Sequence, residues 1–419
     1  MITVKAVAYV PTSAPSRPYI CDGRRNRMAK TIIDTANHIA AYAAKAARVQ
    51  VIAAYPITPQ TSIVERIAEL VEGGELDAEY IRVESEHSAM AACIGAAAAG
   101  VRTFTATAAH GLVLMHEPLH WASGSRLPIV MPVVNRSLGP GWNIWADYTD
   151  SLSQRDTGWI QFYCADNQEV FDTIIQTYKL CENERVLLPA MVCLEAFILS
   201  HTYMPIEIPD QEAIDDFLPP YKPKWFLDVK NPLSHGNIVT PDWYMELRCM
   251  MQEAMENAKQ LIPKIDEEYG KYFGLQHGGL IEKYRCEDAD LILLAMGTMA
   301  SEAKLAVDNL RKEGLKTGTA RIRVFRPFPR DEIRKLAERV QMLVIIDRAI
   351  SFGMGGFLAE EIKASLYGQK DRPLISSFIA GLGGRDVTAE TIERIVKKSW
   401  QWLRAGRVEK ESVWVDLKE

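Results

Sequence analysis

The 419-residue sequence predicts an α/β fold built as a doubly wound unit and a second, smaller α/β unit with a connector between them. Three observations predict it. Apolar runs of strand length alternate with helical segments through roughly the first 200 residues. Some of these runs, such as LPIVMPVVNR at 127–136, are apolar on both faces, as strands inside a parallel sheet are. The alternation gives way to a proline-rich stretch at 201–245 and resumes near residue 287.

The elements of the first unit follow from hydrophobic spacing and from residues that end an element. Residues 29–48 are rich in alanine at helical spacing and predict a first helix. The strand at 49–59 must end in a turn, since Pro56 and Pro59 cannot continue a ladder. The remaining predicted elements are a helix at 61–74, a strand at 79–85, a helix at 88–100, a strand at 101–108, a turn at 109–111, a helix at 112–124, a strand at 127–136, a helix at 168–183 and a strand at 187–197.

The second half of the chain follows a different plan. Prolines and aromatics at 201–245 predict an irregular connector, followed by a long polar helix at 245–273. The second unit is predicted from a strand at 288–297, a helix at 301–314, a strand at 319–329, a helix at 331–340, a strand at 342–349 and a glycine-rich turn opening a helix at 351–368. The predicted domains are an N-terminal arm at 1–29, a first domain at 30–200, the connector and helix at 201–286, a second domain at 287–395 and a docking tail at 396–419.

Composition and charge argue against several function classes. The net charge of -6 leaves no basic stripe for nucleic acid. No apolar run reaches the roughly 20 residues that span a bilayer, so we expect no membrane contact. The first residues lack the features of a signal peptide, and the cytoplasm is the expected location. Seven scattered cysteines without a C-x-x-C pair argue against an iron–sulfur cluster or a metal site within this chain.

The stretch at 54–111 carries the strongest functional signal. It places a Pro-Thr-Pro turn and a second polar turn at the carboxyl ends of two predicted strands, where α/β sheets bind ligands. Between them, Glu86 heads the run HSAMAACIGAAAAG, whose small side chains let another body approach closely. We therefore expect this carboxylate to face a cofactor or a partner subunit.

Five segments in order resemble the alpha subunit of the pyruvate:ferredoxin oxidoreductase family, the 2-oxoacid:acceptor oxidoreductases. They are YPITPQTSIVE, YIRVESEHSAMAACIGAAAAG, RLPIVMPVVNR, WNIWADYTDSLSQRDTGWIQFY and VFRPFP. The resemblance covers roughly residues 30–395. It implies that the first domain is the pyrimidine-binding domain of a thiamine diphosphate enzyme and that the second is a transketolase C-terminal-like α/β domain. It also implies that Mg²⁺ with the diphosphate site, and the iron–sulfur clusters, belong to partner subunits.

The resemblance gives Glu86 the central role. Thiamine needs a carboxylate against N1′ of its aminopyrimidine, and a partly desolvated carboxyl group can share that proton at neutral pH. Pro56 and Ile57 are then expected beside the cofactor. Glu84, two residues earlier, is a competitor for the role. The alternative for Glu86 is a carboxylate that only stabilises a helix N-terminus.

Thr58 and Arg136 are implied to hold the carboxylate of the substrate. A guanidinium binds a carboxylate through charge-assisted hydrogen bonds, and a turn hydroxyl adds a fixed donor. The alternatives are a structural ion pair for Arg136 and an ordinary turn residue for Thr58.

Ala109 and His110 depart from the family pattern, in which pyruvate-type members usually carry Ser-Gln. The segment SLGPGWN after Arg136 also differs from the commoner form. Both changes lie beside the expected substrate site and predict a bulkier or aromatic 2-oxoacid, such as phenylglyoxylate. His110 either binds the substrate or lies behind it without selecting it.

We therefore predict an alpha subunit for thiamine- and coenzyme A-dependent oxidative decarboxylation of a 2-oxoacid to acyl-CoA and CO₂. The expected partners are beta-, gamma- and delta-type subunits, coenzyme A and a ferredoxin- or NAD-reducing component. One alternative is a pyruvate-specific alpha subunit, and another is a non-catalytic scaffold. The SFGMGG turn at 351–356 lacks a complete phosphate-binding fingerprint, and His116 with His120 lacks a third metal ligand.

Overall fold

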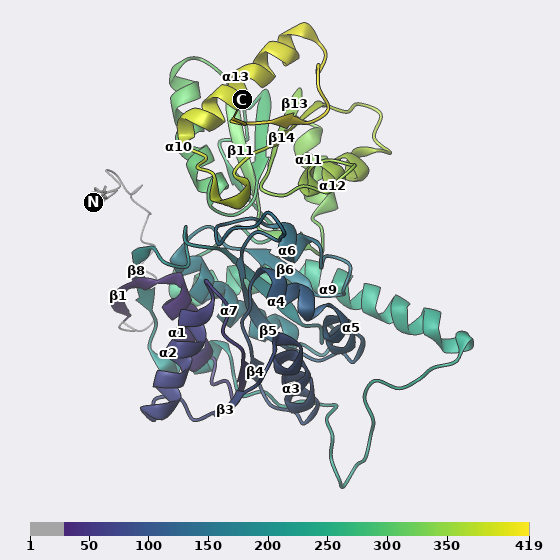
Figure 1. The fold of residues 1–419 in the computed structure, drawn as a ribbon. Coiled ribbons are helices and arrows are strands. Elements are labelled where there is room, and N and C mark those ends of the chain that lie inside the picture. Colours follow the sequence, from purple (N-terminus) through teal and green to yellow (C-terminus); the bar gives the residue numbers. More distant parts are fainter. Residues whose placement is uncertain (1–28, 419) are drawn as a thin grey trace.

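The computed structural model describes residues 29–418. Figure 1 shows two α/β units stacked on each other, the first in purple to teal below and the second in green to yellow above. The N-terminal arm predicted at 1–29 lies, except for its last residue, outside the described residues. Within those residues, no helix is both long enough and apolar enough to cross a bilayer.

The first unit is built on a seven-stranded sheet with the order β12-β6-β7-β5-β4-β2-β3. Every neighbouring pair runs parallel except β12 with β6. Its strands are β2 (Val51–Ala54), β3 (Glu79–Arg82), β4 (Thr103–Phe104), β5 (Val130–Asn135), β6 (Ile160–Tyr163), β7 (Ala190–Glu195) and β12 (Val324–Arg326). The central strands are buried along their whole length, as their continuous apolar runs predict.

Helices cover both faces of this sheet (Figure 1). On one face α1 packs against α2 and α7, and on the other α3 packs against α4 and α5. The helices of this unit are α1 (Ala36–Ala46), α2 (Thr61–Glu72), α3 (Glu86–Ala98), α4 (Ala109–Leu114), α5 (His116–Gly124), α6 (Thr149–Leu152), α7 (Asn167–Cys181), α8 (Gln211–Phe217) and α9 (Pro241–Phe273).

The prediction of one helix over 29–48 is wrong at its start. Residues Lys30–Thr35 form strand β1, which pairs antiparallel with β8 (Tyr203–Ile208) in a separate two-stranded sheet. The β-branched run in KTIIDT favours a strand, and the Thr35 hydroxyl then caps α1 by accepting from the His38 amide. The connector at 201–245 is accordingly less irregular than predicted, because β8 and α8 lie within it.

The second unit has a six-stranded sheet with the order β15-β14-β13-β10-β11-β9. Only β9 runs antiparallel to its neighbour. The elements of this unit are β9 (Ile281–Tyr284), β10 (Leu291–Ala295), α10 (Thr298–Lys312), β11 (Thr317–Ile322), α11 (Arg330–Ala337), β13 (Met342–Asp347), α12 (Phe357–Leu366), β14 (Leu374–Ile379), α13 (Ala389–Ala405) and β15 (Val413–Trp414).

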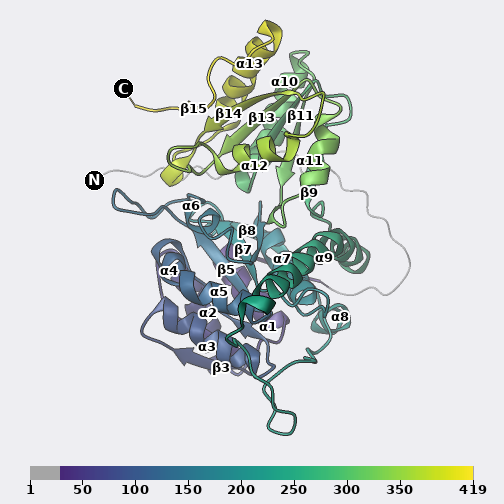
Figure 2. The same cartoon turned by 90° about the vertical axis from the view of Figure 1, so that its right-hand side faces the viewer.

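The C-terminal residues are part of this second unit. Helix α13 continues through residue 395, where a domain boundary was predicted, and β15 pairs with β14 at the sheet edge. Residues 396–418, predicted as a tail, thus complete a helix and a strand (Figure 2).

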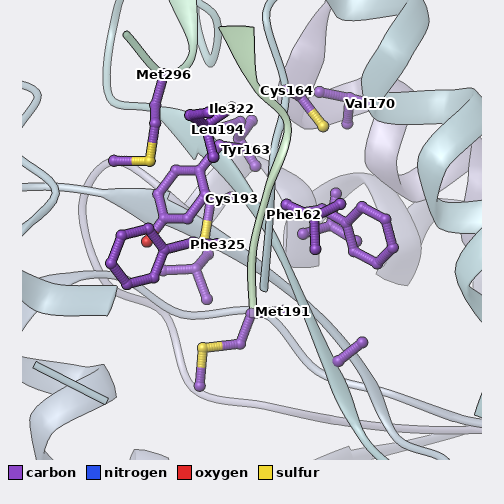
Figure 3. Close-up of a cluster of buried hydrophobic side chains, with 14 of the residues drawn as sticks. Phe162, Tyr163, Cys164, Val170, Met191, Cys193, Leu194, Met296, Ile322 and Phe325 are labelled. Atoms are coloured by element: carbon purple, nitrogen blue, oxygen red, sulfur yellow. The ribbon is translucent and has the colours of Figure 1, made fainter. Parts of the chain in front are cut away.

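One extended segment contributes a strand to the sheet of each unit. The strand predicted at 319–329 divides into β11 in the second sheet and β12, which pairs with β6 in the first. Figure 3 shows the buried cluster at this crossing, with side chains from both units in one core. Its labelled members are Phe162, Tyr163, Cys164, Val170, Met191, Cys193, Leu194, Met296, Ile322 and Phe325.

A buried ionic cluster strengthens the same junction. The Glu169 carboxylate, at the start of α7, accepts from Arg321 Nη1 at 2.7 Å and from Arg323 Nε at 2.8 Å. All three side chains are almost fully buried. Burial alone would raise the pKa of Glu169, but the positive charges of Arg321, His277 and Arg323 outweigh it and lower the pKa to about 2.

This cluster predicts a pH-dependent effect of Glu169→Gln. A glutamate in an unfolded chain has a pKa of about 4.3, so the stabilisation from Glu169 is complete above that pH and is lost as the pH falls toward 2. The substitution leaves the buried Arg323 guanidinium without a carboxylate and Arg321 with only that of Glu282, and breaking a buried ion pair typically costs about 3–5 kcal/mol at pH 7. Urea unfolding at pH 7, 5 and 3 should therefore show a gap between the two proteins that narrows with acid. The exposed Glu267→Gln is the control, and a gap that stays constant across this range contradicts the account.

Candidate active site

The site predicted from the sequence lies where the strand order of the first sheet reverses. The chain passes from β2 to β3 on one side and then crosses to β4 on the other side of β2. Ligands in open α/β sheets bind outside the carboxyl ends of the strands at such a point. The turn after β2, the start of α3, the turn after β4 and the end of β5 all meet there.

Glu86 is the first residue of α3 and is only 6% exposed. The preceding Ser85 is extended, and its hydroxyl caps the helix by accepting from the Ser88 amide at 3.2 Å. Within residues 29–418, the Glu86 carboxylate has no hydrogen-bonding partner. Glu84 differs in both respects, since it is exposed and accepts a hydrogen bond from the Ser88 hydroxyl.

A glycine makes room for the Glu86 carboxylate. At Gly111, in α4, an added Cβ would overlap Glu86 Oε1 and would lie 2.6 Å from Thr107 Oγ1. The Thr107 hydroxyl is also buried without a partner. Gly111 and Thr107 are not predicted as site residues from the sequence, because their importance depends on how α3 approaches α4.

Gly111→Ala is therefore expected to move the Glu86 carboxylate and to lower turnover in the assembled complex by about 10²-fold, the usual cost of a shift of roughly 1 Å. Steady-state turnover of the complex measures the effect. Gly124→Ala in α5 is the matched control, because a Cβ there meets nothing within 4 Å. Equal turnover for the two variants would show that Gly111 does not position the Glu86 carboxylate.

The Pro-Thr-Pro turn is fixed by buried amide side chains. Asn37 Nδ2 donates to the Pro59 carbonyl at 2.6 Å, and Gln60 Oε1 accepts from the Ile57 amide at 3.2 Å. Both amide residues are fully buried. Pro56 and Thr58 are exposed and Ile57 is half-buried, so the turn presents its outer side to the site.

Arg136 follows β5 and is brought to the same place. Its Nη1 donates to the Thr58 carbonyl at 2.5 Å, and its Nη2 lies 3.1 Å from His110 Nδ1. The guanidinium is 4.9 Å from the ring centroid of Trp142, in the loop that follows. Burial lowers the pKa of Arg136, and the Asp150 and Glu86 carboxylates oppose this shift. The charges of Arg136 and Glu86 therefore act on one site.

Asp150 is a buried residue that the sequence analysis missed. Its Oδ2 accepts from the backbone amides of Ala109 and Arg136, both at 3.0 Å. Its Oδ1 accepts from Asn135 Nδ2 and from the Ser151 amide. Burial raises the pKa of Asp150 to about 7, and these four hydrogen bonds limit the rise. This carboxyl group ties the start of α4 to the residue after β5 and so positions Arg136.

Ala109 and His110 do not open space in the site. Ala109 is fully buried with φ 43°, a conformation that L-residues rarely adopt, and its amide is held by Asp150. The segment predicted as a turn at 109–111 is the first turn of α4. His110 is exposed and lies against Arg136, Gly139 and the Trp142 ring. The imidazole thus fills volume beside Arg136.

Two other motifs were considered as ligand sites: the SFGMGG turn for a nucleotide, and His116 with His120 for a metal ion. At the glycine-rich turn, the Asp347 carboxylate accepts from the Leu358 and Ala359 amides, so an acidic group occupies the start of α12 where a nucleotide phosphate would bind. His116 hydrogen-bonds Gln154 at 2.5 Å and lies edge-on to His120. Across residues 29–418, no group of three or more histidine, cysteine or acidic side chains is placed to hold a metal ion.

The chemistry of the site fits the aminopyrimidine of thiamine. A carboxylate that is largely enclosed by protein but accepts no hydrogen bond from it is free to accept one from a protonated ring nitrogen. Glu86 is such a carboxylate, and the space beside it is kept clear by Gly111.

Comparisons with known proteins match both units of the chain to described domain families. Residues 42–267 match the family model described as pyruvate flavodoxin/ferredoxin oxidoreductase, thiamine diphosphate-binding, and residues 289–392 match pyruvate:ferredoxin oxidoreductase core domain II. The chain is 51% identical to the ketoisovalerate oxidoreductase subunit VorA of Pyrococcus horikoshii over 91% of this chain and 97% of the relative. It is 51% identical to the pyruvate synthase subunit PorA of Pyrococcus abyssi, over 92% and 97%.

Two solved structures have a fold similar to that of this chain. The 2-oxoglutarate:ferredoxin oxidoreductase from Magnetococcus marinus superposes with a TM-score of 0.68 at 18% identity. The match covers 88% of this chain and 65% of that longer chain. A split-gene transketolase superposes with a TM-score of 0.52 at 12% identity, over 87% of this chain and 98% of the other.

Proposed function

The chain belongs to the pyruvate:ferredoxin oxidoreductase family, and from this premise we propose that it is the alpha subunit of a 2-oxoacid:ferredoxin oxidoreductase complex. Its reaction is the oxidative decarboxylation of a 2-oxoacid to acyl-CoA and CO₂. The observation that carries the proposal is Glu86, a buried carboxylate without a partner within residues 29–418, at the topological switch point of the sheet.

Glu86 holds a proton at N1′ of the aminopyrimidine. Bound thiamine diphosphate would supply the nucleophilic carbon and would accept the electron pair left behind when CO₂ departs. The carboxylate favours the cofactor tautomer that can accept a proton, because it shares its own proton with the ring nitrogen. Its burial keeps this hydrogen bond away from water, where it is stronger.

Arg136 and Thr58 bind and orient the 2-oxoacid. The guanidinium supplies charge-assisted donors for the substrate carboxylate, and the exposed Thr58 side chain borders the same space. Asp150 fixes the backbone of Arg136, so the guanidinium is positioned before substrate arrives.

An aliphatic 2-oxoacid of the size of pyruvate or ketoisovalerate is the proposed substrate. The names of the relatives indicate such acids. An aromatic substrate such as phenylglyoxylate, expected from the Ala109–His110 departure, has no support from the comparisons. Pyruvate remains an alternative to ketoisovalerate, because the two kinds of relative are equally similar.

Other subunits complete the cofactor site and receive the electrons. The proposed partners are beta-, gamma- and delta-type subunits that carry the diphosphate and Mg²⁺ site and the iron–sulfur clusters. Coenzyme A accepts the acyl group, and ferredoxin or a NAD-reducing subunit accepts the electrons. The small, partly exposed side chains of α3 support this assignment, because they let a partner approach Glu86 closely.

An exposed apolar arm adjoins this face. We use the term arm for residues 225–250, which comprise a loop and the first ten residues of α9, all ten of which are exposed (Figure 1). Its exposed apolar side chains are Trp225, Leu227, Val229, Ile238, Trp243, Tyr244, Met245, Leu247 and Met250. The arm starts beside α3, where the Leu227 amide donates to the Ala98 carbonyl, and Gly236 lies against Trp121 of α5. Apolar surface of this extent indicates a protein interface.

Met245→Asp is therefore expected to weaken assembly of the complex without unfolding the chain. Met245 is 76% exposed, so the free chain should keep its thermal midpoint, while the charge should reduce co-elution with the partner subunits. Size-exclusion chromatography of the co-expressed subunits measures this. Tyr367→Asp, at an equally exposed position of the second unit, is the control. Unchanged assembly of the Met245 variant would exclude the arm as an interface.

A substrate panel tests the function itself. The purified complex should reduce a low-potential dye with a 2-oxoacid only when thiamine diphosphate and coenzyme A are present. Pyruvate and ketoisovalerate should exceed phenylglyoxylate and 2-oxoglutarate in kcat/KM. A complex that reduces the dye with none of these acids would instead support the scaffold alternative.

A further inference from the structure

The imidazole of His110 lies between two hydrogen-bond donors. Its Nδ1 is 3.1 Å from Arg136 Nη2, and its Nε2 is 3.0 Å from the backbone nitrogen of Gly139. A guanidinium carries only donors, and a backbone amide nitrogen is a donor as well. Both ring nitrogens of His110 therefore face N–H groups.

An imidazole cannot satisfy both of these donors. The neutral ring has one N–H and one free lone pair, and the protonated ring has two N–H groups. Whichever tautomer forms, at least one ring N–H points at another N–H. A carboxylate differs, because each of its two oxygens accepts hydrogen bonds. The pair formed by Arg136 and Gly139 thus matches a carboxylate better than it matches the side chain beside it.

The surroundings of Arg136 support the presence of an anion subsite. Arg136 is 5% exposed, and its Nε is buried without a hydrogen-bonding partner. Trp142 lies against the guanidinium at 4.9 Å and meets the His110 ring edge-on at 5.9 Å between centroids. A Cβ at Gly139 would collide with the Trp142 ring, so glycine lets the loop bring its amide to this position.

We propose that His110 occupies the carboxylate subsite as a displaceable side chain, and that the substrate carboxylate replaces it between Arg136 and the Gly139 amide. The ligand class is a 2-oxoacid, so this inference rests on the proposed function. His110 is exposed and can turn out toward solvent, whereas Arg136 is held by Thr58 and by Asp150. His110 then competes with the substrate, and Gly139 is an additional ligand of the carboxylate.

His110→Ala in the assembled complex tests the proposal. Removing the competitor should lower the KM for the 2-oxoacid and the inhibition constant of acetate by about fivefold each, the equivalent of one ordinary hydrogen bond. Acetamide, which has acetate's shape but no charge, should bind more weakly than acetate to both proteins, because it lacks the charge that Arg136 recognises. His110→Gln, which retains an acceptor and a donor, should fall between wild type and His110→Ala.

Two results would overturn the proposal. A rise in KM for His110→Ala, with a normal thermal midpoint, would make His110 a substrate ligand. Equal constants for acetate in wild type and variant would show that the imidazole does not compete. Acetate binding to the full-length chain, followed by NMR of labelled acetate, keeps the test independent of turnover. If the wild-type complex failed to oxidise any 2-oxoacid, the proposed function would fail while tighter acetate binding by the variant still supported the subsite.

Discussion

Replacing Glu86 by glutamine is expected to reduce turnover of the assembled complex by about 10²- to 10⁴-fold, the range associated with loss of a general acid–base group. Glutamine keeps the size of the side chain and its place at the start of α3, but it cannot exchange a proton with a ring nitrogen. Because the side chain is buried and has no hydrogen-bonding partner among residues 29–418, the substitution breaks no bond that holds the described fold. Stability should therefore change little while catalysis is lost.

The control for this prediction is Glu84→Gln. Glu84 lies two residues earlier, is exposed, and bonds only the Ser88 hydroxyl. Its substitution should leave turnover within about twofold of wild type. Turnover of both variants is measured as the rate of 2-oxoacid-dependent dye reduction. Similar losses for both would mean that the prediction of Glu86 as the catalytic carboxylate is wrong.

Replacing Arg136 by methionine is expected to lower kcat/KM for a 2-oxoacid by about 10²-fold, or about 3 kcal/mol. The substrate carboxylate would lose its charged donors, and the Thr58 carbonyl would lose the Nη1 hydrogen bond. Methionine has nearly the same length and apolar character as the stem of arginine, so the cavity left behind is small.

Steady-state kinetics should locate the loss mainly in KM, because the charge acts on binding before the chemical step. Arg48→Met is the matched control. Arg48 forms an exposed ion pair with Asp215, at 2.7 Å, which contributes little to stability and touches no part of the site. A wild-type KM for Arg136→Met would mean that Arg136 does not bind the substrate and has only a structural role.

Much of this site could be predicted from the sequence because its parts are local. The Pro-Thr-Pro turn, the acidic helix start at Glu86 and the apolar strand ending at Arg136 each follow from a short segment. Their meeting follows in turn from the rule that parallel strands place their carboxyl ends at one edge.

The parts that were missed depend on contacts between distant segments. Asp150 reads as an ordinary polar residue, yet it joins the start of α4 to the residue after β5. Gly111 matters only because α3 brings Glu86 to it. The pairing of β1 with β8 joins residues far apart in the chain, and local alanine content gave the opposite prediction for 30–35.

His110 illustrates a different limit. The departure from Ser-Gln signals a change beside Arg136, but residue type alone predicted a larger substrate. The contacts of the imidazole with Arg136 and the Gly139 amide instead place it at the proposed carboxylate subsite, which residue type alone does not reveal.

Titration with thiamine diphosphate and Mg²⁺ tests the central claim most directly, with binding followed by calorimetry for the chain alone, for the assembled complex and for the complex carrying Glu86→Gln. We expect no measurable binding to the chain alone, saturable binding to the complex, and weaker binding to the variant complex, because in the proposed function Glu86 supplies one half of a site that a partner completes. Equal affinity of the wild-type and variant complexes, or full cofactor binding by the chain alone, would contradict it.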